Sequence, residues 1–289
     1  MTGALGPLEN GPLPVFVIHW RSPASLLRTV EALRKQTVAL RIVVLDNASP
    51  RDVLRGLEGH DFDLELMPRN LGYGGALNHA LSRWLASTGS AYAVVCPHDA
   101  LPRPDCVEVI LTTMRRRPRA GLACAEYGVD AAPGYTLLHG YDLYPCVRST
   151  GWCPAEFPNG TLFVVARACL EDVGLFDERY FSYGEEHDLG RRALAAGWEV
   201  GQVWDAVVEN PSCAAPPNVT AYLGLRNGLL ASFQRDGLAA ALVRTCVIAA
   251  NGVRLWLRRA DAKGGSPAIR ARAVRDFWLR RFGAPPELR

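Results

Sequence analysis

Apolar runs that alternate with helical patterns constrain the fold of this chain more than any other feature of its sequence. Four short runs, at residues 15–18, 41–45, 64–67 and 92–96, are each followed by a segment with the apolar spacing of a helix. Strands that alternate with helices predict an α/β fold with a mostly parallel sheet and right-handed connections. At 289 residues the chain can bury the core of one large α/β domain or two small ones.

Each of these four runs ends in polar or ionisable residues. In open α/β sheets, ligands bind beyond the carboxyl ends of the strands, so we expect these residues to gather at one site. Four polar strand ends in succession indicate a surface that binds a nucleotide. The residues are His19, Asp46, Asn47, Arg69, Asn70, His98 and Asp99.

A glycine-rich segment, residues 70–78, connects the third run to its helix. Glycines allow the backbone to approach a ligand closely, and a helix N-terminus offers free amide donors to a phosphate. A purely structural glycine turn explains the segment equally well. A dinucleotide fingerprint is excluded, because that motif follows the first strand and has Gly-x-Gly-x-x-Gly spacing.

The segment 176–198 places several acids at the start of a predicted helix. Ser182 is the predicted N-cap, Glu185 would complete a capping box, and Gly197 would end the helix. Helical spacing places Glu185 on a charged stripe facing water and Glu186 at the tip of a small apolar stripe facing the interior. We therefore favour a capping role for Glu185, which stays a second catalytic candidate. Glu186 is the predicted general base, held ionised by the helix dipole, and a simple dipole charge is its alternative.

Asp99 closes the fourth run and could hold a divalent cation, Mg or Mn, that bridges a diphosphate. An Asx-type turn before the following Leu and Pro is a nearly equal explanation.

The long section from 127 to 158 is predicted to be irregular and contains many aromatic residues, among them Trp152 and Phe157. Long loops in compact domains are usually functional or disordered, and the aromatic content argues against disorder. Such rings could stack on an acceptor sugar, although a satellite core is their more frequent role. Asn159 and Gly160 then lead into a strand at 162–165.

The last part of the chain is basic. From residue 213 onward there are 13 Lys and Arg against 4 Asp and Glu, a balance of +9, which leaves −6 for the first 212 residues. Predicted helices span 222–233, 238–257 and 268–281, and the second is judged too polar to cross a membrane. The third is basic and amphipathic, which favours contact with a membrane surface or a partner over simple packing.

Residues 1–14 have neither a basic start nor an apolar core, so we expect a flexible leader rather than a signal peptide or anchor. Eight cysteines without a Cys-x-x-Cys motif signal neither a zinc site nor a disulfide framework. We therefore expect a cytoplasmic protein, with peripheral attachment to the inner face of the membrane as an option, and no nucleic-acid partner. The oligomeric state stays open, with a dimer as one option.

Three ordered motifs together resemble the family 2 nucleotide-sugar glycosyltransferases, in particular the rhamnosyltransferase-like branch. They are VVLDNAS at 43–49, NLGYGGALN at 70–78 and VGLFDERYFSYGEEHDLGRRALAAGW at 173–198, and the resemblance covers about 15–227. It implies a GT-A fold, with a Rossmann-like sheet over residues 15–212. A nucleotide-sugar half (15–104), an acceptor half (105–212) and a basic helical extension (213–289) would follow one another.

The resemblance also implies an inverting transfer of a sugar, such as the deoxysugar rhamnose, from a nucleoside-diphosphate donor to a hydroxyl-bearing acceptor. The position of Asp46 contacts the donor base or ribose in that family, Asp99 matches the last acid of the metal motif, and Glu186 matches the base. Three departures are visible: Pro97 replaces the first metal-motif acid, the base is Glu rather than Asp, and Glu209 replaces a downstream His.

Pattern and resemblance together assign three groups of residues. The donor group is His19, Trp20, Asp46, Asn47, Arg69, Asn70, Gly72, Gly74, Asn78, His98 and Arg226. The acceptor group is Trp152, Phe157, Asn159 and Gly160, and the metal group is Asp99, His187 and Glu209.

Two other functions compete with this hypothesis. A sugar nucleotidyltransferase would need a glycine-rich loop with a basic residue after the first strand, which the sequence lacks. A catalytically impaired module that only binds a sugar nucleotide is favoured by the altered metal positions and disfavoured by the retained acids at 185, 186 and 188.

Overall fold

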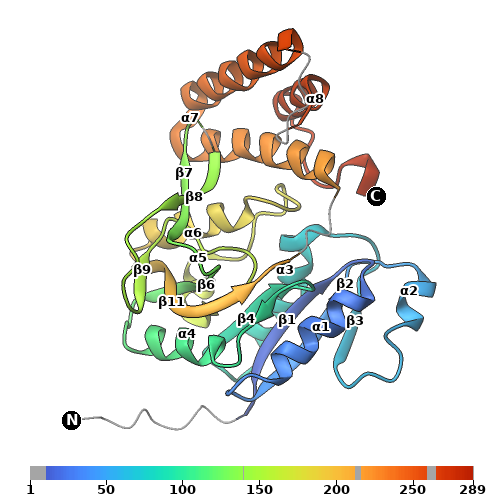
Figure 1. Cartoon of the computed structure of the whole chain (residues 1–289), viewed down its shortest axis with the longest axis vertical. Coiled ribbons are helices and arrows are strands. Elements are labelled where there is room, and N and C mark those ends of the chain that lie inside the picture. The colour runs from blue at the N-terminus through green and yellow to red at the C-terminus, as the bar shows by residue number, and fades with distance from the viewer. Residues whose placement is uncertain (1–10, 139, 212–215, 259–264, 289) are drawn as a thin grey trace.

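The computed structural model describes residues 11–138, 140–211, 216–258 and 265–288. A large mixed sheet with helices packed against it forms the body of the molecule, and two long C-terminal helices stand above it, in orange and red (Figure 1). The predicted leader, residues 1–14, lies largely outside the described residues, and the first strand already begins at Leu13.

Nine strands of the described chain form the main sheet, in the order β3-β2-β1-β4-β10-β6-β11-β5, with β9 paired to β11. Strand β10 runs antiparallel to both neighbours, so the sheet is mostly but not wholly parallel. The remaining strands, β7 and β8, form a separate hairpin. The strands are β1 (Leu13–His19), β2 (Leu40–Asp46), β3 (Asp63–Leu66), β4 (Tyr92–Pro97), β5 (Leu101–Pro102), β6 (Ala120–Glu126), β7 (Ala131–Thr136), β8 (Gly140–Pro145), β9 (Trp152–Pro154), β10 (Phe163–Ala166) and β11 (Glu199–Glu209).

The helices follow the alternation predicted from the sequence. They are α1 (Pro23–Arg34), α2 (Arg51–Arg55), α3 (Gly72–Ala86), α4 (Cys106–Arg115), α5 (Arg167–Val173), α6 (Glu185–Ala195), α7 (Pro217–Arg258) and α8 (Pro267–Trp278), with a short 3-10 helix at Pro286–Leu288. The α/β class and the GT-A-like architecture predicted above are confirmed.

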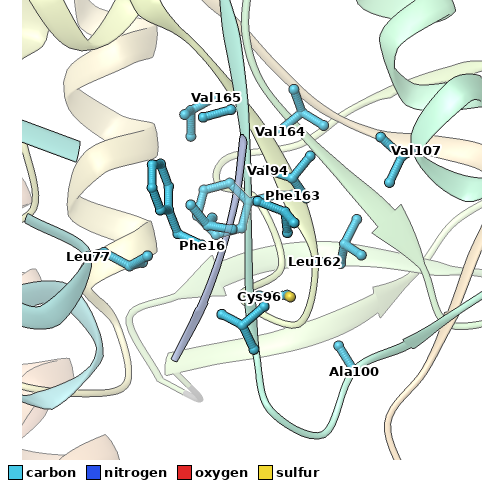
Figure 2. Close-up of a cluster of buried hydrophobic side chains, with 14 of the residues drawn as sticks. Phe16, Leu77, Val94, Cys96, Ala100, Val107, Leu162, Phe163, Val164 and Val165 are labelled. Carbon is cyan, nitrogen blue, oxygen red and sulfur yellow. The ribbon is translucent and has the colours of Figure 1, made fainter. Parts of the chain in front are cut away.

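The main core consists of strand side chains packed against α1, α3 and α4. Figure 2 shows one part of it, where Phe16 of β1 and Phe163 of β10 lie among aliphatic side chains of neighbouring strands. Strands β1, β4, β6 and β10 are buried almost throughout, because helices cover a sheet that would otherwise expose continuous apolar runs. This burial makes the sheet a rigid platform for the residues at its edge.

Strand register brings the polar strand ends together. Strands β1, β2 and β4 are parallel neighbours, with His19 opposite Asp46 and Ile18 opposite Pro97. Because all three strands point the same way, their last residues meet at one edge, which we call the strand-end rim. The predicted gathering of these residues is therefore a consequence of register.

The section predicted to be irregular, 127–158, contains three strands. Its residues form the β7–β8 hairpin and the short strand β9, which extends the sheet beside β11. The prediction was wrong because Pro and Gly interrupt the two-residue alternation of apolar and polar side chains that marks a strand, as in AAPGYT of β7.

The C-terminal helices have small cores of their own. Helix α7 covers both predicted segments, 222–233 and 238–257, and is broken at Gly237, whose φ is 81°. Buried side chains of its first half, such as Leu229 and Leu230, pack with Tyr180 and with Phe277 of α8. By length and composition, the stretch Pro217–Leu257 is apolar enough to cross a membrane, so the predicted exclusion of a span does not follow from composition.

Candidate active site

A pocket of about 390 Å³ opens at the strand-end rim. Four segments, distant in sequence, build its walls: the strand ends, the glycine-rich segment, the residues before β10, and the residues that lead into α6. The predicted site residues among those lining it are Trp20, Asn47, Asn70, Gly72, His98, Asp99, Asn159, Gly160, Glu185 and Glu186. We call this space the rim pocket.

His19 and Asp46 form a buried pair behind the pocket wall. The Nδ1 atom of His19 lies 2.8 Å from Oδ1 of Asp46, and the backbone N–H of Ser49 donates to Oδ2 at 2.8 Å. Burial opposes ionisation of Asp46, but the hydrogen bonds from His19 and Ser49 outweigh it and hold the pKa of Asp46 below its ordinary value. Both residues stabilise the rim, and neither is among the side chains that line the pocket.

Asn47 connects the rim to the glycine-rich segment. Its Nδ2 donates to the carbonyl of Gly72, and its Oδ1 accepts from the N–H of Leu71, both at 2.8 Å. Gly72 has a φ of +76°, and a methyl group there would overlap the carbonyl of Phe181. Only glycine allows this close approach. The glycine at position 72 is therefore explained by its contact with Phe181 as well as by its place in the wall of the pocket.

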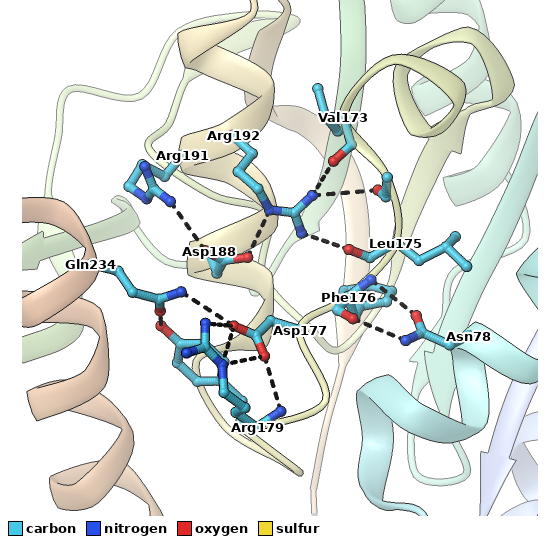
Figure 3. Close-up of polar contacts among 12 residues, drawn as sticks. Asn78, Val173, Leu175, Phe176, Asp177, Arg179, Asp188, Arg191, Arg192 and Gln234 are labelled. Carbon is cyan, nitrogen blue, oxygen red and sulfur yellow. Dashed lines mark hydrogen bonds and ion pairs between the residues drawn. The ribbon is translucent and has the colours of Figure 1, made fainter. Parts of the chain in front are cut away.

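Three further predicted donor residues, Asn78, Gly74 and Arg69, are not among those that line the rim pocket. Asn78 exchanges two hydrogen bonds of 2.9 Å with the backbone of Phe176 (Figure 3), Gly74 packs on Phe176, and Arg69 is exposed. Gly72 and Tyr73, at the start of α3, do line the pocket, whereas Gly74 and Asn78 lie on the side of α3 that contacts the segment preceding α6.

Helix α6 begins at Glu185 and not at Ser182. Gly184 is the N-cap, with a φ of 102°, and the Oγ of Ser182 accepts a hydrogen bond from the backbone N–H of Tyr73 at 3.1 Å. The predicted capping box is therefore absent. Glu185 is buried, with 1% of its surface exposed, and the Oε2 atom has no hydrogen-bond partner among the described residues.

The prediction for the two faces of α6 is half right. The small apolar stripe of Leu189, Gly190 and Ala193 is buried, as predicted. Glu185 and Asp188 are buried as well, whereas Glu186 is partly exposed in the pocket. The charged stripe is covered because Asp188 pairs with Arg191 at 3.3 Å and with Arg192 at 2.7 Å. Arg192 in turn donates to the carbonyls of Val173 and Leu175 (Figure 3). A helical pattern alone does not reveal that another segment covers this side.

Glu186 occupies a space that Gly160 leaves open. A methyl group at position 160 would overlap Oε1 of Glu186, and Oε2 accepts a weak hydrogen bond of 3.4 Å from the N–H of Gly184. Burial raises the pKa of Glu186. The pKa of Glu185 is raised well above the ordinary range, first by burial and second by the charge of Glu186. The helix dipole does not dominate, contrary to the prediction of an acid held ionised.

The segment before α6 is held in an unusual conformation by α7. Phe181, Tyr183 and Gly184 all have positive φ values. The Nδ2 of Asn227 donates to the carbonyls of Tyr180, Ser182 and Tyr183 at 2.7–2.9 Å. Strained backbone of this kind concentrates at functional sites, where surrounding contacts stabilise it.

Arg226 was predicted to contact the donor, and the structure places it elsewhere. It is 1% exposed and donates to the carbonyls of Tyr180 and Gly283 at 3.0 and 2.8 Å. Its guanidinium lies over the ring of Tyr222. Arg226 therefore fastens the C-terminal segment to the body, and the prediction was wrong because it treated an arginine with local carbonyl partners as free.

A second, more open pocket adjoins the first. Phe157 and the hairpin residues Tyr141 and Leu143 line it, and it shares Glu186 and Gly160 with the rim pocket. We call it the hairpin pocket. Trp152, by contrast, pairs with Val203 in the sheet and lies under Arg117, so its assignment to the acceptor is not supported.

Several residues of the rim pocket were not singled out from the sequence. Tyr73 donates from its hydroxyl to the carbonyl of Gly160 at 2.8 Å, and Tyr127 bonds to both Asn159 and Thr161. Leu223 and Leu288 reach the pocket from the C-terminal part. Tyr73 stands inside the glycine-rich motif and could have been found, whereas Leu288 carries no local signal.

A protein-only metal site is not built. Within the described ranges, no three His, Cys, Asp or Glu side chains form a group able to hold a metal ion. His187 is packed among the rings of Tyr135, Tyr141 and Phe157, and burial, together with nearby arginines, lowers its pKa to about 3. Glu209 is exposed at the end of β11. The structure gives neither metal assignment support, and both stay predictions.

Asp99 does face the rim pocket. Burial raises its pKa to about 6, and the neighbouring His98 bonds to the carbonyl of Ile18, with a pKa lowered to about 4 by burial. One carboxylate fits a divalent cation only if the diphosphate of a donor supplies further oxygen ligands, as Mg²⁺ sites commonly allow.

A Rossmann-like sheet with a pocket at its strand ends and carboxylates in the wall of that pocket is the arrangement of a GT-A-like fold. Residues 15–145, slightly less than half of the chain, match the model of Glycosyl transferase family 2.

Relatives of known activity are distant. The N-acetylglucosaminyl-diphospho-decaprenol L-rhamnosyltransferase of Mycobacterium tuberculosis is 26% identical over 224 residues, covering 64% of this chain and 71% of that protein. The low-salt glycan biosynthesis hexosyltransferase Agl10 of Haloferax volcanii is 21% identical over 76% of this chain and 75% of that protein.

Two solved structures share the fold. The mannosyltransferase PcManGT of Pyrobaculum calidifontis, in complex with GDP-Man and Mn²⁺, aligns with a TM-score of 0.59 at 16% identity, over 96% of this chain and 91% of that one. GalNAc-T7 with UDP, GalNAc and Mn²⁺ also gives a TM-score of 0.59, at 15% identity, over 75% of this chain and 48% of that one.

Proposed function

We propose that this glycosyltransferase moves a sugar from a nucleoside-diphosphate donor to a hydroxyl acceptor with inversion, and that Glu186 is its general base. The observation that carries the proposal is the position of Glu186, in the wall shared by the rim pocket and the hairpin pocket. The donor would occupy the rim pocket and the acceptor the hairpin pocket. A carboxylate between the two would lie beside both reacting atoms.

The rim pocket suits a nucleotide sugar. Trp20 offers a ring for stacking, and the amide side chains of Asn47, Asn70 and Asn159 lie in its wall. Its volume of about 390 Å³ is within the common range of ligand sites, which starts near 300 Å³. The rhamnosyltransferase relative supports a deoxyhexose such as rhamnose as the transferred sugar.

The proposed reaction is a single displacement. Glu186 removes the proton of the acceptor hydroxyl, whose oxygen bonds to the anomeric carbon while the bond from that carbon to the diphosphate oxygen breaks. Glu185, with the more strongly raised pKa, stays protonated while Glu186 ionises. Asp99 would hold a divalent cation through one carboxylate, and that cation would neutralise charge on the leaving diphosphate.

Replacing Glu186 with Gln tests the proposal. We expect Glu186→Gln to lower the transfer rate by roughly 100- to 10,000-fold, the usual contribution of a general base, while nucleoside-diphosphate binding is retained. The wild-type rate should rise with pH through the raised pKa of Glu186, because only the ionised form accepts the proton. Product formation and calorimetric binding would be measured in parallel.

Glu171→Gln is the matched control, because Glu171 is exposed on α5, away from both pockets. Normal transfer by Glu186→Gln would contradict the assignment of the base. Donor binding by the wild type without transfer or donor hydrolysis would instead support the alternative, a module that binds sugar nucleotides without catalysis, which the lack of a protein-only metal site favours.

A further inference from the structure

The second half of α7 exposes apolar side chains to solvent. Of the 15 exposed large hydrophobic residues in the described chain, nine lie at or after Phe233. Residues 233–289 are about a fifth of the chain, so the clustering exceeds the scattered exposure that is normal for a soluble surface. The most exposed of these nine are Trp256 at 69% and Leu257 at 68%.

These side chains share one face of the helix. At 3.6 residues per turn, the six exposed apolar positions of this half fall within an arc of about 140°. We call this arc, with the two exposed residues at the end of α8, the C-terminal apolar face; its members are Leu238, Leu242, Val243, Val253, Trp256, Leu257, Trp278 and Leu279. The opposite side of the helix, with Ala241 and Ile248, is buried against the protein.

Arginines surround this face. Arg270 and Arg275 line an apolar groove between α7 and α8, together with Val253 and Trp256. Arg254 lies at the edge of the arc and is exposed, as are Arg280 and Arg281 after α8. Of the nearby acids that the structure describes, Asp276 is buried and pairs with Arg275, Glu287 pairs with Arg272, and the exposed Asp236 lies beside Arg235. Arginines outnumber these acids, so the net charge beside the apolar face is positive.

We propose that the C-terminal apolar face docks on the surface of an anionic lipid bilayer, with its aromatic and aliphatic side chains at the headgroup boundary and its arginines on lipid phosphates. Apolar residues with Trp on one face and arginines beside them are typical of helices that lie in a membrane interface. A second copy of this chain fits less well, because a symmetric contact would bring the same arginines face to face.

The contacts of α7 also favour a helix that lies on the membrane surface over one that crosses the membrane. Arg244, in the middle of this half of α7, is 5% exposed and donates to the carbonyl of Leu137 at 2.7 Å. The break at Gly237 and the contacts of Asn227 hold the first half of α7 within the fold. A spanning helix would have to place Arg244 in hydrocarbon without these partners.

Docking would hold the hairpin pocket on the far side of α7 from the bilayer, about one helix diameter away. Arg244 fastens the tip of the β7–β8 hairpin to the side of α7 opposite the C-terminal apolar face, and Tyr141 and Leu143 of that hairpin line the pocket. If the proposed function holds, the acceptor is then a sugar carried on a membrane lipid, whose headgroup extends past α7 so that its hydroxyl reaches the hairpin pocket. This last step rests on the proposed function, whereas docking itself does not.

Sedimentation of the full-length protein with phosphatidylcholine vesicles, with and without phosphatidylglycerol, tests the docking. We expect binding only to the anionic vesicles, weakened by salt, and a roughly tenfold loss of affinity in Trp256→Ser/Leu257→Ser. Arg254→Gln should weaken binding about fivefold. The matched control is Leu64→Ser/Leu66→Ser, two exposed leucines on β3.

Three outcomes would overturn the proposal: no vesicle binding, equal loss in the control, or wild-type protein that resists extraction from membranes by alkaline carbonate, as a spanning helix would. A change of native mass in the Trp256/Leu257 variant, without an effect on vesicles, would assign the face to a second copy instead. Transfer to a soluble acceptor without vesicle binding would refute docking alone. Vesicle binding without transfer to any acceptor would refute the proposed function alone.

Discussion

The strand-end rim and the C-terminal apolar face depart from ordinary burial in opposite directions. At the rim, polar side chains such as His19, Asp46 and Asn47 are at most 3% exposed. At the C-terminal apolar face, large apolar side chains such as Trp256 and Leu257 are more than half exposed. The rim therefore buries polar side chains that water would hydrate, and the C-terminal apolar face exposes apolar side chains that would normally be buried.

The two regions differ in where their side chains find contacts. Rim polar groups are satisfied within the fold, through pairs such as His19 with Asp46 and through the contacts of Asn47 with the glycine-rich segment. They therefore shape a pocket whose wall includes Glu186, the proposed general base. The C-terminal apolar side chains have no such partners within the described chain, which indicates a surface completed by something outside it.

The largest effect on the transfer rate is expected at Gly160, next to the carboxylate of Glu186. Gly160→Ala would push a methyl group against Oε1 of Glu186 and displace the carboxylate. We expect the transfer rate to fall about 100-fold, as for a misplaced catalytic group, with little change in melting temperature. Gly89→Ala is the control, because a methyl group there meets no atom within 4 Å. An unchanged rate in Gly160→Ala would show that the position of this carboxylate does not matter.

Asn227 connects α7 to the segment before α6, and removing its side chain should weaken the fold. Asn227→Ala deletes the hydrogen bonds from Nδ2 to the carbonyls of Tyr180, Ser182 and Tyr183, of which that of Tyr180 keeps other donors. We expect a loss of about 2 kcal/mol in the free energy of unfolding, measured by urea denaturation, together with reduced transfer. The exposed Asn251, also on α7, provides the control Asn251→Ala. Equal stability of both variants would mean that α7 does not hold this segment.

A smaller effect, of opposite sign, is expected for Glu185→Gln. Folding raises the pKa of Glu185 above its value of about 4.5 in the unfolded chain. Above that pH the unfolded chain loses the proton while the folded protein retains it. Glu185 therefore lowers the free energy of unfolding progressively as the pH rises above about 4.5. The variant should therefore gain about 1 kcal/mol in unfolding free energy at pH 8 and nearly nothing at pH 4. A gain that does not depend on pH would contradict the buried, protonated state of Glu185.

The smallest effect on stability is expected at the C-terminal apolar face. Leu257→Ser should change the unfolding free energy by less than about 0.5 kcal/mol, because this leucine is 68% exposed. The buried Leu229, on the same helix, provides the contrast, since Leu229→Ser should cost several times more. A large loss of stability in Leu257→Ser would show that the exposed face belongs to a core.

Local patterns were sufficient for strands β1, β2, β3, β4 and β10, for most helices and for the polar strand ends. The apolar runs at 15–18 and 92–96 lie inside β1 and β4, and the predicted gathering of His98, Asn47 and Asp99 followed from parallel register. Patterns of this kind depend on neighbours in sequence, which is why they could be interpreted without the structure. The hairpin escaped detection because its strands lack clear alternation.

Contacts between distant segments decided the rest. The acids at 185 and 186 are adjacent in sequence, and only packing by distant segments, such as α3 at Gly74 against Glu185, determines that the first is 1% exposed and the second is partly exposed. The same reason separates Arg226, which binds carbonyls, from the donor-binding role its charge suggested. Composition and periodicity determine which elements form; the desolvation and pairing of each charged side chain depend on what the fold packs against it.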